Sequence, residues 1–451
     1  MSTASTLQAI GVSSVSGRCP WRLDYCVDGL PVHAFFRPPS VVADQITACE
    51  VGLVALPVAC HLAASVRPKT VSFSGSSAHR AYFPVFRSAI RALLVEQDAT
   101  WGRPRFTASP SLVQRGKAAA APVSRRPLDS KKVVLAFGGG KDSLVCLFGL
   151  LRAGYQVIPL LVNEGDRSWQ DLRRWLPRLE ALGLEPLTAY LRIQPNAALR
   201  VRYGDWHLSS YQIGCLLAVG SITATKLGAG VLALGLESSA DRVGQCYRGV
   251  PVNHQHQKTT RHVLEAQRFM NLVLHGHLRF ASPIAPFSDE EVLRALFAGV
   301  PPQWRSFSSC GGSNSMSKHC GECAKCAYIF ALLARTRKGA RLASDLFRRD
   351  LFEDIELYRP WLDGRFRDPL ACIGESWELW SALDDASFFR PRAPVVRKWL
   401  NSPLRQRFME LRASQSRVKV THAALEVPLE RATRLIRSWS AVKEGPAPAT
   451  Q

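Results

Sequence analysis

The sequence lacks any run of eighteen or more apolar residues, and a helix that spans a membrane needs about that many. Its first twenty residues lack a basic stretch followed by an unbroken apolar core, so they do not resemble a secretory signal. Acidic residues are scarce as well, because 36 Asp and Glu stand against 58 Lys and Arg. These absences predict a cytoplasmic protein with no membrane span and a preference for anionic partners.

The formal net charge of +22 does not by itself identify the partner. The arginines are scattered through helical patterns such as LRRWLPRLE and RKGARLASDLFRRD, and they are not gathered in a basic tail. Scattered arginine is more typical of a solvated surface than of a nucleic-acid-binding stripe, and base-stacking motifs are missing. Nucleic acid is therefore not expected, and a small substrate that carries phosphates and carboxylates fits the charge.

Twelve cysteines in 451 residues are too few for the framework of a disulfide-rich fold. Eight of them are dispersed singly, several in apolar stretches where a cysteine is usually a small buried hydrophobic residue. These eight are Cys19, Cys26, Cys49, Cys60, Cys146, Cys215, Cys246 and Cys372.

The other four cysteines form a cluster with the spacing C-x9-C-x2-C-x2-C, and they are Cys310, Cys320, Cys323 and Cys326. Thiolates two residues apart can face one ion, and four of them complete a tetrahedral zinc shell that leaves no position open for catalysis. The spacing therefore predicts a structural Zn²⁺ site. An iron–sulfur cluster remains an alternative.

Four segments are predicted along the chain. Residues 1–127 form a small N-terminal α+β domain, with strands over 30–37 and 70–75 and an amphipathic helix over 83–97. Residues 128–305 form an ATP-binding α/β domain, 306–335 the zinc knuckle, and 336–451 a helical C-terminal region with a disordered tail, KEGPAPATQ. An Ala-, Pro- and Arg-rich stretch over 115–132 is interpreted as a linker.

The second segment alternates between strand and helix patterns. Strands are predicted over 133–137, 156–163, 187–193 and 231–237, and helices over 168–183, with a kink at Pro177, and over 207–227. This alternation predicts a doubly wound parallel sheet. In such sheets the ligand lies beyond the carboxyl ends of the strands, where the motif GGGKDS follows the first strand.

The GGGKDS motif comprises Gly138, Gly139, Gly140, Lys141, Asp142 and Ser143. Its glycines let the backbone approach a ligand, and the free N–H groups of a helix start attract an anion. The motif fits neither a Walker A loop, which needs Ser or Thr directly after the lysine, nor the dinucleotide fingerprint GxGxxG. Asp142 suits a phosphate site only if Mg²⁺ lies between the carboxylate and the anion.

The motif instead resembles the PP-loop of ATP pyrophosphatases, usually SGGxDS, with Gly138 in place of the first serine. This resemblance implies that the loop grips the β and γ phosphates of ATP, so that the α-phosphorus is attacked and pyrophosphate leaves. It also implies that Val162 and Asn163, at the end of the second strand, meet the adenine. A PP-loop followed by a CGxCxxC knuckle also resembles the deazaguanine-forming synthases.

Further segments resemble the UDP-MurNAc-L-Ala-L-Glu epimerase family, MurL. They are LALGLESSADR (232–242), VPVNHQHQKTTRHVLEAQ (250–267), SPIAPFSDEEVLRALF (282–297), WRSFSSC (304–310), CGECAKC and DPLACIGESWE (368–378). The resemblance implies an enzyme that inverts the terminal L-Glu of a UDP-linked muramyl dipeptide through carboxylate adenylation, with ATP and Mg²⁺. A ligase that adds L-Glu to UDP-MurNAc-L-Ala is then its functional partner.

For the base that removes the α-proton we favour His254, because an imidazole titrates near neutrality. Asp241, Cys246 and His256 are the alternatives, and Lys141 joins the catalytic set. Substrate phosphate or carboxylate contacts are predicted at Lys258, Arg242 and Arg261. The competing interpretations are a PP-loop enzyme that modifies a nucleobase, by tRNA thiolation or deazaguanine nitrile formation, and a zinc-bearing nucleic-acid binder.

Overall fold

The structure of the chain is a computed structural model. It describes residues 6–14, 21–66, 68–73, 105–108, 127–164, 167–195, 197–203, 212–241, 245–247, 250–252, 256–274, 276–305, 307, 319–364, 373–374, 376–414, 425 and 427–441. These residues belong to two compact units. The first unit combines residues 1–138, 154–234 and 241–281, and the second combines residues 139–153, 235–240 and 282–451.

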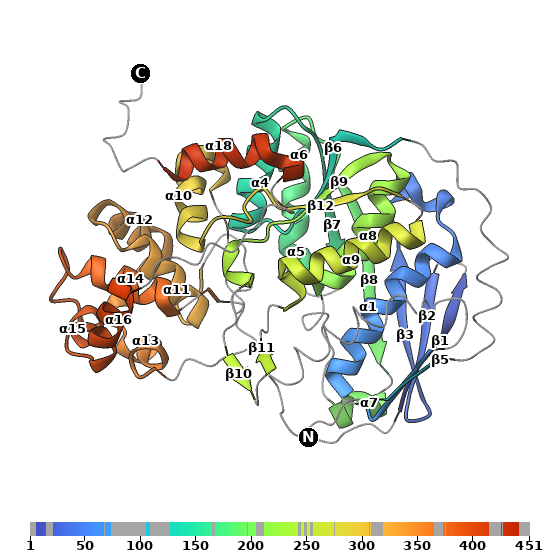
Figure 1. Cartoon of the computed structure of the whole chain (residues 1–451), viewed down its shortest axis with the longest axis horizontal. Coiled ribbons are helices and arrows are strands. Elements are labelled where there is room, and N and C mark those ends of the chain that lie inside the picture. Colours follow the sequence, from blue (N-terminus) through green and yellow to red (C-terminus); the bar gives the residue numbers. More distant parts are fainter. Residues whose placement is uncertain are drawn as a thin grey trace. The chain divides into compact units, whose positions relative to one another are not determined.

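The first unit is built on a ten-stranded sheet (Figure 1). Along the sheet the strand order is β12-β9-β6-β7-β8-β3-β2-β1-β4-β5. The strands are β1 (Thr6–Ser14), β2 (Trp21–Val27), β3 (Leu30–Arg37), β4 (Thr70–Phe73), β5 (Arg105–Ala108), β6 (Asp129–Ala136), β7 (Gln156–Asn163), β8 (Leu187–Pro195), β9 (Ala229–Ala233) and β12 (Arg279–Ala281).

The predicted parallel, doubly wound arrangement is present from β6 to β12. Neighbouring strands in the order β8-β7-β6-β9-β12 are all parallel. In the sheet β7 lies on one side of β6, and β9, which comes later in the chain, lies on its other side. The strand order therefore reverses beside β6, which is where such sheets bind their ligands. The strand predicted over 133–137 is present as β6, in which Val133, Val134 and Leu135 are fully buried. β6 begins earlier than predicted, at Asp129, so residues 129–132 belong to the strand and not to the predicted linker.

The N-terminal strands extend this same sheet. β3 pairs antiparallel with β8, from Val32 opposite Pro195 to Arg37 opposite Tyr190, and β2 and β1 continue the antiparallel run. The sequence predicted residues 1–127 as a separate small domain, but their strands share hydrogen bonds with the α/β sheet. An edge strand with unpaired backbone groups is a ready template for another strand, which explains the extension physically. The strands predicted at 30–37 and 70–75 are present as β3 and β4.

Helices that contact the sheet or each other include α1 (Ala48–Val66), α8 (Gln212–Lys226) and α9 (Thr260–Leu274) (Figure 1). The predicted helix over 168–183 is broken into α5 (Arg167–Leu172), η3 (Arg173–Trp175) and α6 (Leu176–Glu180), because Pro177 cannot continue the backbone ladder. The remaining short elements are η1 (Ser40–Gln45), α7 (Ala197–Tyr203), η5 (Ser238–Asp241), η6 (His256–Lys258) and the hairpin β10 (Gln245–Tyr247) with β11 (Val250–Val252). The predicted helix over 83–97 lies outside the described residues.

The second unit is helical in its described residues. It contains α4 (Lys141–Arg152), α10 (Asp289–Gly299), η7 (Pro302–Trp304), α11 (Ala324–Leu333), α12 (Arg337–Phe347), η8 (Leu351–Glu353), α13 (Ile355–Leu362), α14 (Ser376–Ala386), α15 (Pro394–Leu400), α16 (Pro403–Ser414), η9 (Val427–Leu429) and α18 (Glu430–Ser440). The helical C-terminal region agrees with the sequence prediction. The tail after residue 441 lies outside the described residues.

Helices α4 and α10 approach the last helix, α18, at glycine positions. A Cβ atom on Gly149 would lie 2.6 Å from Ile436 Cδ1, and one on Gly299 would lie 2.1 Å from the Trp439 ring. Larger residues would therefore push the helices apart. This close packing holds the first turns of α4 and α10 in one compact helical group.

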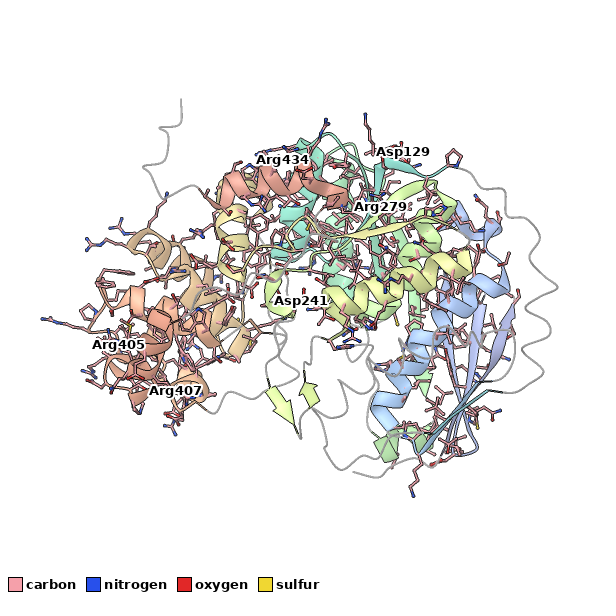
Figure 2. All side chains as sticks on the ribbon, viewed as in Figure 1. Asp129, Asp241, Arg279, Arg405, Arg407 and Arg434 are labelled. Atoms are coloured by element: carbon pink, nitrogen blue, oxygen red, sulfur yellow. The ribbon has the colours of Figure 1, made fainter. Side chains whose placement is uncertain are left out.

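Charged side chains lie on elements of both units (Figure 2). Arg279 on β12, Arg407 on α16 and Arg434 on α18 are exposed, whereas Arg405 pairs with Asp384 at 2.9 Å. The arginines thus behave as a scattered, solvated set, as the sequence predicted. Within the described part of the chain, none of the helices has the length and apolar content needed to cross a membrane.

Candidate active site

The glycine loop joins strand β6 to helix α4. Gly139 adopts a left-handed backbone conformation with φ +69°, which a glycine accepts without strain. Gly140 is the N-cap of α4, and among the described residues no side chain caps that helix. The first N–H groups of α4 therefore have no side-chain cap and could bind an anion, and the role of the loop in phosphate binding stays a prediction. Ser143 Oγ donates to Gly140 O at 3.0 Å.

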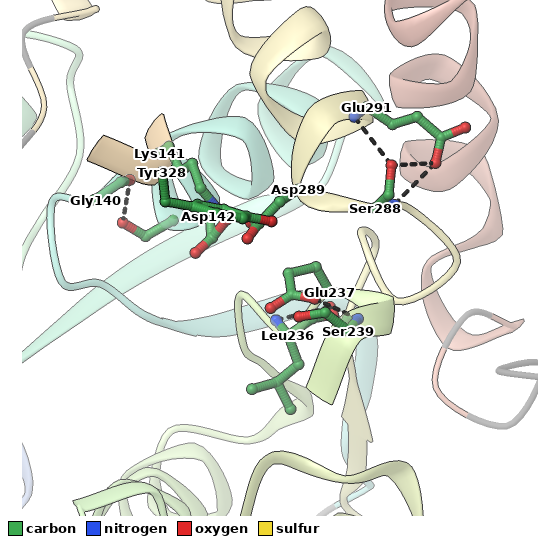
Figure 3. Close-up of polar contacts among 12 residues, drawn as sticks. Gly140, Lys141, Asp142, Leu236, Glu237, Ser239, Ser288, Asp289, Glu291 and Tyr328 are labelled. Atoms are coloured by element: carbon green, nitrogen blue, oxygen red, sulfur yellow. Dashed lines mark hydrogen bonds and ion pairs between the residues drawn. The ribbon is translucent and has the colours of Figure 1, made fainter. Parts of the chain in front are cut away.

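Lys141 occupies the first position of α4 and is only 5% exposed. Its Nζ donates a hydrogen bond to Asp142 Oδ1 at 2.5 Å and a second one to Oδ1 of Asp289 (Figure 3). Asp289 is the first residue of α10. Burial lowers the pKa of Lys141, but the attraction of Asp142, Asp289 and Glu237 outweighs this effect and raises the pKa above its ordinary value. Lys141 is therefore a permanent cation in the apo site.

Asp289 is held by the start of helix α10. Ser288 accepts a hydrogen bond from Glu291 N at 3.3 Å, and Glu291 Oε2 accepts one from Ser288 N at 2.8 Å, which together form a capping box (Figure 3). This cap fixes the first turn of α10, and thereby the backbone that carries Asp289. Asp289 is 5% exposed, so its carboxylate contacts Lys141 with little access to bulk water.

Glu237 adds a third carboxylate near Lys141. It follows strand β9, and its Oε2 accepts a hydrogen bond from Ser239 N at 2.6 Å (Figure 3). Burial and the nearby Asp289 carboxylate raise the pKa of Glu237 to about 7, although Lys141 opposes the shift. Gly235, two residues earlier, lies against the loop helix, because a Cβ atom there would be 2.8 Å from Asp142 Cβ.

Tyr328 on α11 approaches the same group. Its hydroxyl donates to Glu378 Oε2 on α14, and the side chain is fully buried. A Cβ atom on Gly374 would lie 2.0 Å from Tyr328 Oη and 2.5 Å from Asp289 Oδ2, so these two oxygens border the same point. The C-terminal helices therefore supply residues to the surroundings of Lys141.

Sequence reasoning missed four residues of this cluster, namely Glu237, Asp289, Tyr328 and Glu378. Glu237 and Asp289 lie in segments that carried the family resemblance, GLESSADR and FSDEE, but nothing in the spacing linked them to Lys141. The capping-box pattern at Ser288 is the one local signal that could have placed Asp289 at a helix start. Tyr328 and Glu378 meet only through packing of α11 and α14.

The proposed base candidates belong to the first unit. Asp241 accepts two hydrogen bonds from Thr260, one from N at 2.6 Å and one from Oγ1 at 2.5 Å, and so caps the start of α9. His256 lies beside His262, with ring centroids 5.2 Å apart. Burial lowers the pKa of His256, and it lowers that of His262 to about 3. Both imidazoles are therefore neutral at pH 7.

Three other predicted residues are described only in part or not at all. His254 and Arg242 lie outside the described residues, and Cys246 is placed only through its backbone, opposite Pro251 in the hairpin. Lys258 is partly buried in η6, while Arg261 is mostly exposed and pairs with Glu265 at 3.0 Å. Val162 and Asn163 do end strand β7, as the predicted adenine contact requires. Gly138 faces open space.

The cysteine cluster forms as predicted in its described part. Cys320, Cys323 and Cys326 place their sulfurs within 4.8 Å of one another, and Cys320 Sγ lies 3.7 Å from Cys326 Sγ. Zinc–sulfur bonds of about 2.3 Å in a tetrahedron place two sulfurs about 3.8 Å apart, so this geometry fits the ion. Gly321 makes the turn with φ +72°, and Arg349 donates to its carbonyl. The fourth cysteine, Cys310, lies outside the described residues.

The dispersed cysteines show the expected burial where they are described. Cys60, Cys146 and Cys215 are buried, and Cys26 is partly buried. Cys19 and Cys372 lie outside the described residues, and the side chains of Cys49 and Cys246 do as well. Burial raises the pKa of the Cys146 thiol, so this cysteine of the loop helix is protonated and unreactive.

Two family descriptions match the chain. The MurL N-terminal domain matches residues 104–282, and the MurL C-terminal domain matches residues 305–414. The chain belongs to the MurL family. The first match contains the glycine loop and the second contains the described cysteines, Tyr328 and Glu378.

Curated relatives agree with the MurL assignment. The chain is 31% identical over 281 residues to UDP-N-acetyl-alpha-D-muramoyl-L-alanyl-L-glutamate epimerase of Micromonospora sp., covering 58% of this chain and 59% of the relative. It is 27% identical over 262 residues to the enzyme of the same name from Xanthomonas oryzae pv. oryzae, covering 55% of each chain. The chain thus spans little more than half the length of these relatives.

A relative with a different name matches part of the chain. The chain is 29% identical over 225 residues to 7-cyano-7-deazaguanine synthase 1 of Desulfitobacterium hafniense. The matched region covers 44% of this chain and 90% of the relative. This similarity agrees with the resemblance that the loop and the knuckle suggested. It links MurL-type chains to a second type of chemistry.

Replacing Cys323 by serine tests the metal interpretation. Cys323→Ser should abolish stoichiometric metal in the purified protein and lower Tm, because a structural site contributes directly to folding. Metal analysis by plasma mass spectrometry identifies zinc or iron. Cys26→Ser is the matched control and should keep the metal. A wild-type protein that contains neither metal would contradict the assignment.

Glu237 should leave a signature in the pH dependence of stability. Its folded-state pKa of about 7 lies above the unfolded value of about 4.3, so the folded protein holds the proton more tightly. Its contribution is fully present below pH 4.3 and is lost as pH rises to about 7. Glu237→Gln should therefore raise Tm at pH 8 more than at pH 5.

The measurement is thermal unfolding of the apo protein at both pH values, with the exposed Glu353→Gln as control. An equal change in Tm at pH 5 and pH 8 for Glu237→Gln would contradict the raised pKa.

Proposed function

We propose that this chain is an ATP-dependent epimerase that inverts the terminal L-Glu of UDP-MurNAc-L-Ala-L-Glu to D-Glu, releasing AMP and pyrophosphate. The observation that carries the proposal is the buried Lys141 at the uncapped start of α4, in a chain that belongs to the MurL family. Relatives named as epimerases of this muramyl dipeptide support the substrate.

Adenylation gives the chemistry a physical reason. The α-proton of a free carboxylate is nearly inert, because the anion cannot accept further charge. Attack of the L-Glu α-carboxylate on the α-phosphorus of ATP displaces pyrophosphate and forms an acyl adenylate. Its acyl group no longer carries the carboxylate charge, so the α-proton is far more acidic. A base removes this proton, a proton returns on the opposite face, and water releases AMP and the D-residue.

The second unit offers positively charged and N–H groups for the phosphates of ATP, and carboxylates for the Mg²⁺ ion that accompanies it. The backbone N–H groups of Gly140 to Ser143 and the Lys141 ammonium suit the phosphates. Asp142 and Asp289 offer carboxylate oxygens, the ligand type that Mg²⁺ prefers. When bound, the metal ion would neutralise the pyrophosphate leaving group. Three carboxylates around one lysine leave an excess of negative charge that favours such a cation.

For the α-proton base, His254 stays our first choice, and His256 is the alternative among the described residues. His256 is neutral at pH 7, so it can accept a proton. Asp241 is less suited, because its carboxylate already accepts two hydrogen bonds from Thr260. Cys246 remains in the candidate set. Lys258 and Arg261 are proposed contacts to substrate phosphate or carboxylate groups.

The second candidate function is modification of a nucleobase, and the similarity to 7-cyano-7-deazaguanine synthase 1 favours it. Such an enzyme would also begin by adenylating a carboxylate. Thiolation is disfavoured, because Cys146 on the loop helix is buried and protonated. The match to the MurL C-terminal domain over 305–414 supports the epimerase instead. We further propose that the protein is cytoplasmic and that its functional partner is the ligase that adds L-Glu to UDP-MurNAc-L-Ala.

Incubation with ATP, Mg²⁺ and UDP-MurNAc-L-Ala-L-Glu should yield AMP and D-Glu, measured by nucleotide chromatography and chiral analysis. Asp142→Ala should lower AMP formation at least 100-fold, because it removes a carboxylate from the metal and phosphate site but no core volume. Glu353→Ala, exposed on the same unit, is the control. AMP formation with a carboxylated deazaguanine, and none with the dipeptide, would favour the second function.

The histidine variants separate adenylation from proton transfer. If His254 is the base, His254→Ala should still form AMP but lose inversion by about 10²-fold or more, the usual contribution of a positioned acid–base group. His256→Ala should show this pattern if it is the base instead. Exposed His277→Ala is the control. Deuterium incorporation at the glutamate α-carbon in D₂O measures proton removal directly, and equal loss of AMP and inversion would exclude a residue as the base.

A further inference from the structure

The segment that contains Gly374 and Glu378 matched the family resemblance, but the proposed chemistry gives it no role. In the structure Glu378 accepts the hydrogen bond of the Tyr328 hydroxyl. Gly374 leaves room for that hydroxyl beside Asp289, since a Cβ atom there would collide with both side chains. Asp289 in turn holds Lys141. Glu378, Tyr328 and Asp289 therefore lie one after another beside the lysine of the glycine loop, with the Tyr328 hydroxyl near the Asp289 carboxylate.

The direction of the single phenolic hydrogen decides what Asp289 can do. The hydroxyl of Tyr328 has two carboxylates near it, Glu378 and Asp289, but it can donate to only one of them. Because the hydrogen goes to Glu378, Asp289 keeps its full charge for the buried lysine. A hydrogen bond from the phenol to Asp289 would draw charge away from Lys141 and from any bound cation.

We propose that Tyr328 and Glu378 are positioning residues for the phosphate-binding lysine. Glu378 takes the phenolic hydrogen, the phenol oxygen lies beside Asp289, and both oxygens of Asp289 stay available for Lys141 and the metal that accompanies ATP. Gly374 is required because no larger residue fits between the phenol and the carboxylate. This inference rests on the proposed binding of ATP at the glycine loop.

The roles can be separated by three variants. Glu378→Leu removes the acceptor, so the phenolic hydrogen turns to Asp289, and kcat/KM for ATP should fall at least tenfold. Glu378→Gln keeps an acceptor oxygen and should stay within about threefold of wild type. In Tyr328→Phe/Glu378→Leu there is no hydrogen to misdirect, so the double variant should be more active than Glu378→Leu alone.

This non-additivity distinguishes positioning from a structural role, because independent losses of packing would simply accumulate in the double variant. Tyr358→Phe is the matched control, since the buried Tyr358 hydroxyl donates to Ala327 O on the same helix α11 at 2.8 Å. It should lower Tm while leaving kcat/KM for ATP unchanged. A double variant that is no more active than Glu378→Leu would overturn the proposal.

Crystal structures of wild type and Glu378→Leu test the geometry without any catalysis. In Glu378→Leu the phenol oxygen should lie at hydrogen-bond distance, about 2.7 Å, from Asp289 Oδ2. An unmoved phenol and an unchanged Lys141–Asp289 contact would overturn the proposal. Failure of the proposed function shows separately, as wild-type protein that binds no ATP and forms no AMP, while this structural comparison still decides the positioning role.

Discussion

The buried ammonium group of Lys141 is the constraint on which the second unit depends. An unpaired charge in a protein interior costs several kcal/mol, so the fold has to bring carboxylates to it. Asp142 comes from the same helix turn, but Asp289 comes from the start of α10 and Glu237 from the turn after β9. The ion pairs with Asp142 and Asp289 therefore tie together segments that are far apart in the sequence, and losing either partner would leave the lysine charge less well compensated.

The charges around Lys141 also affect which ligands can bind there. Helix α4 begins with free N–H groups that attract an anion, while the carboxylates around Lys141 repel one. We therefore expect an anionic ligand to bind together with a cation that offsets the carboxylates, which agrees with the proposed binding of ATP with Mg²⁺. The pKa of about 7 for Glu237 reflects the same excess of negative charge, because one carboxylate of the group is held partly protonated near neutral pH.

The sequence predicted the features that depend on neighbouring residues. The strand before Gly138, the helix after Gly140, the alternation of strands and helices and the cysteine spacing are all local patterns, and the structure contains them. Asp289 could not be predicted as the partner of Lys141, because only the packing of α10 brings it there. Tyr328 and Glu378 could not be predicted either, because they meet only through the packing of α11 and α14. The pairing of β3 with β8 was missed for the same reason, since Val32 and Pro195 are joined by register and not by any sequence signal. The role of His254 stays a prediction.

The second unit is assembled from three separate stretches of chain, and this has a consequence for how the protein folds during synthesis. Helix α4 leaves the ribosome early, but its packing partner α18 lies near the C-terminus. At about 5–20 residues per second, tens of seconds separate the two helices. Throughout that interval the face of α4 that includes Gly149 and Arg152, which lie against Ile436 and Trp439, has no α18 to cover it. The native packing of this face of α4 can therefore form only after α18 has emerged, late in synthesis.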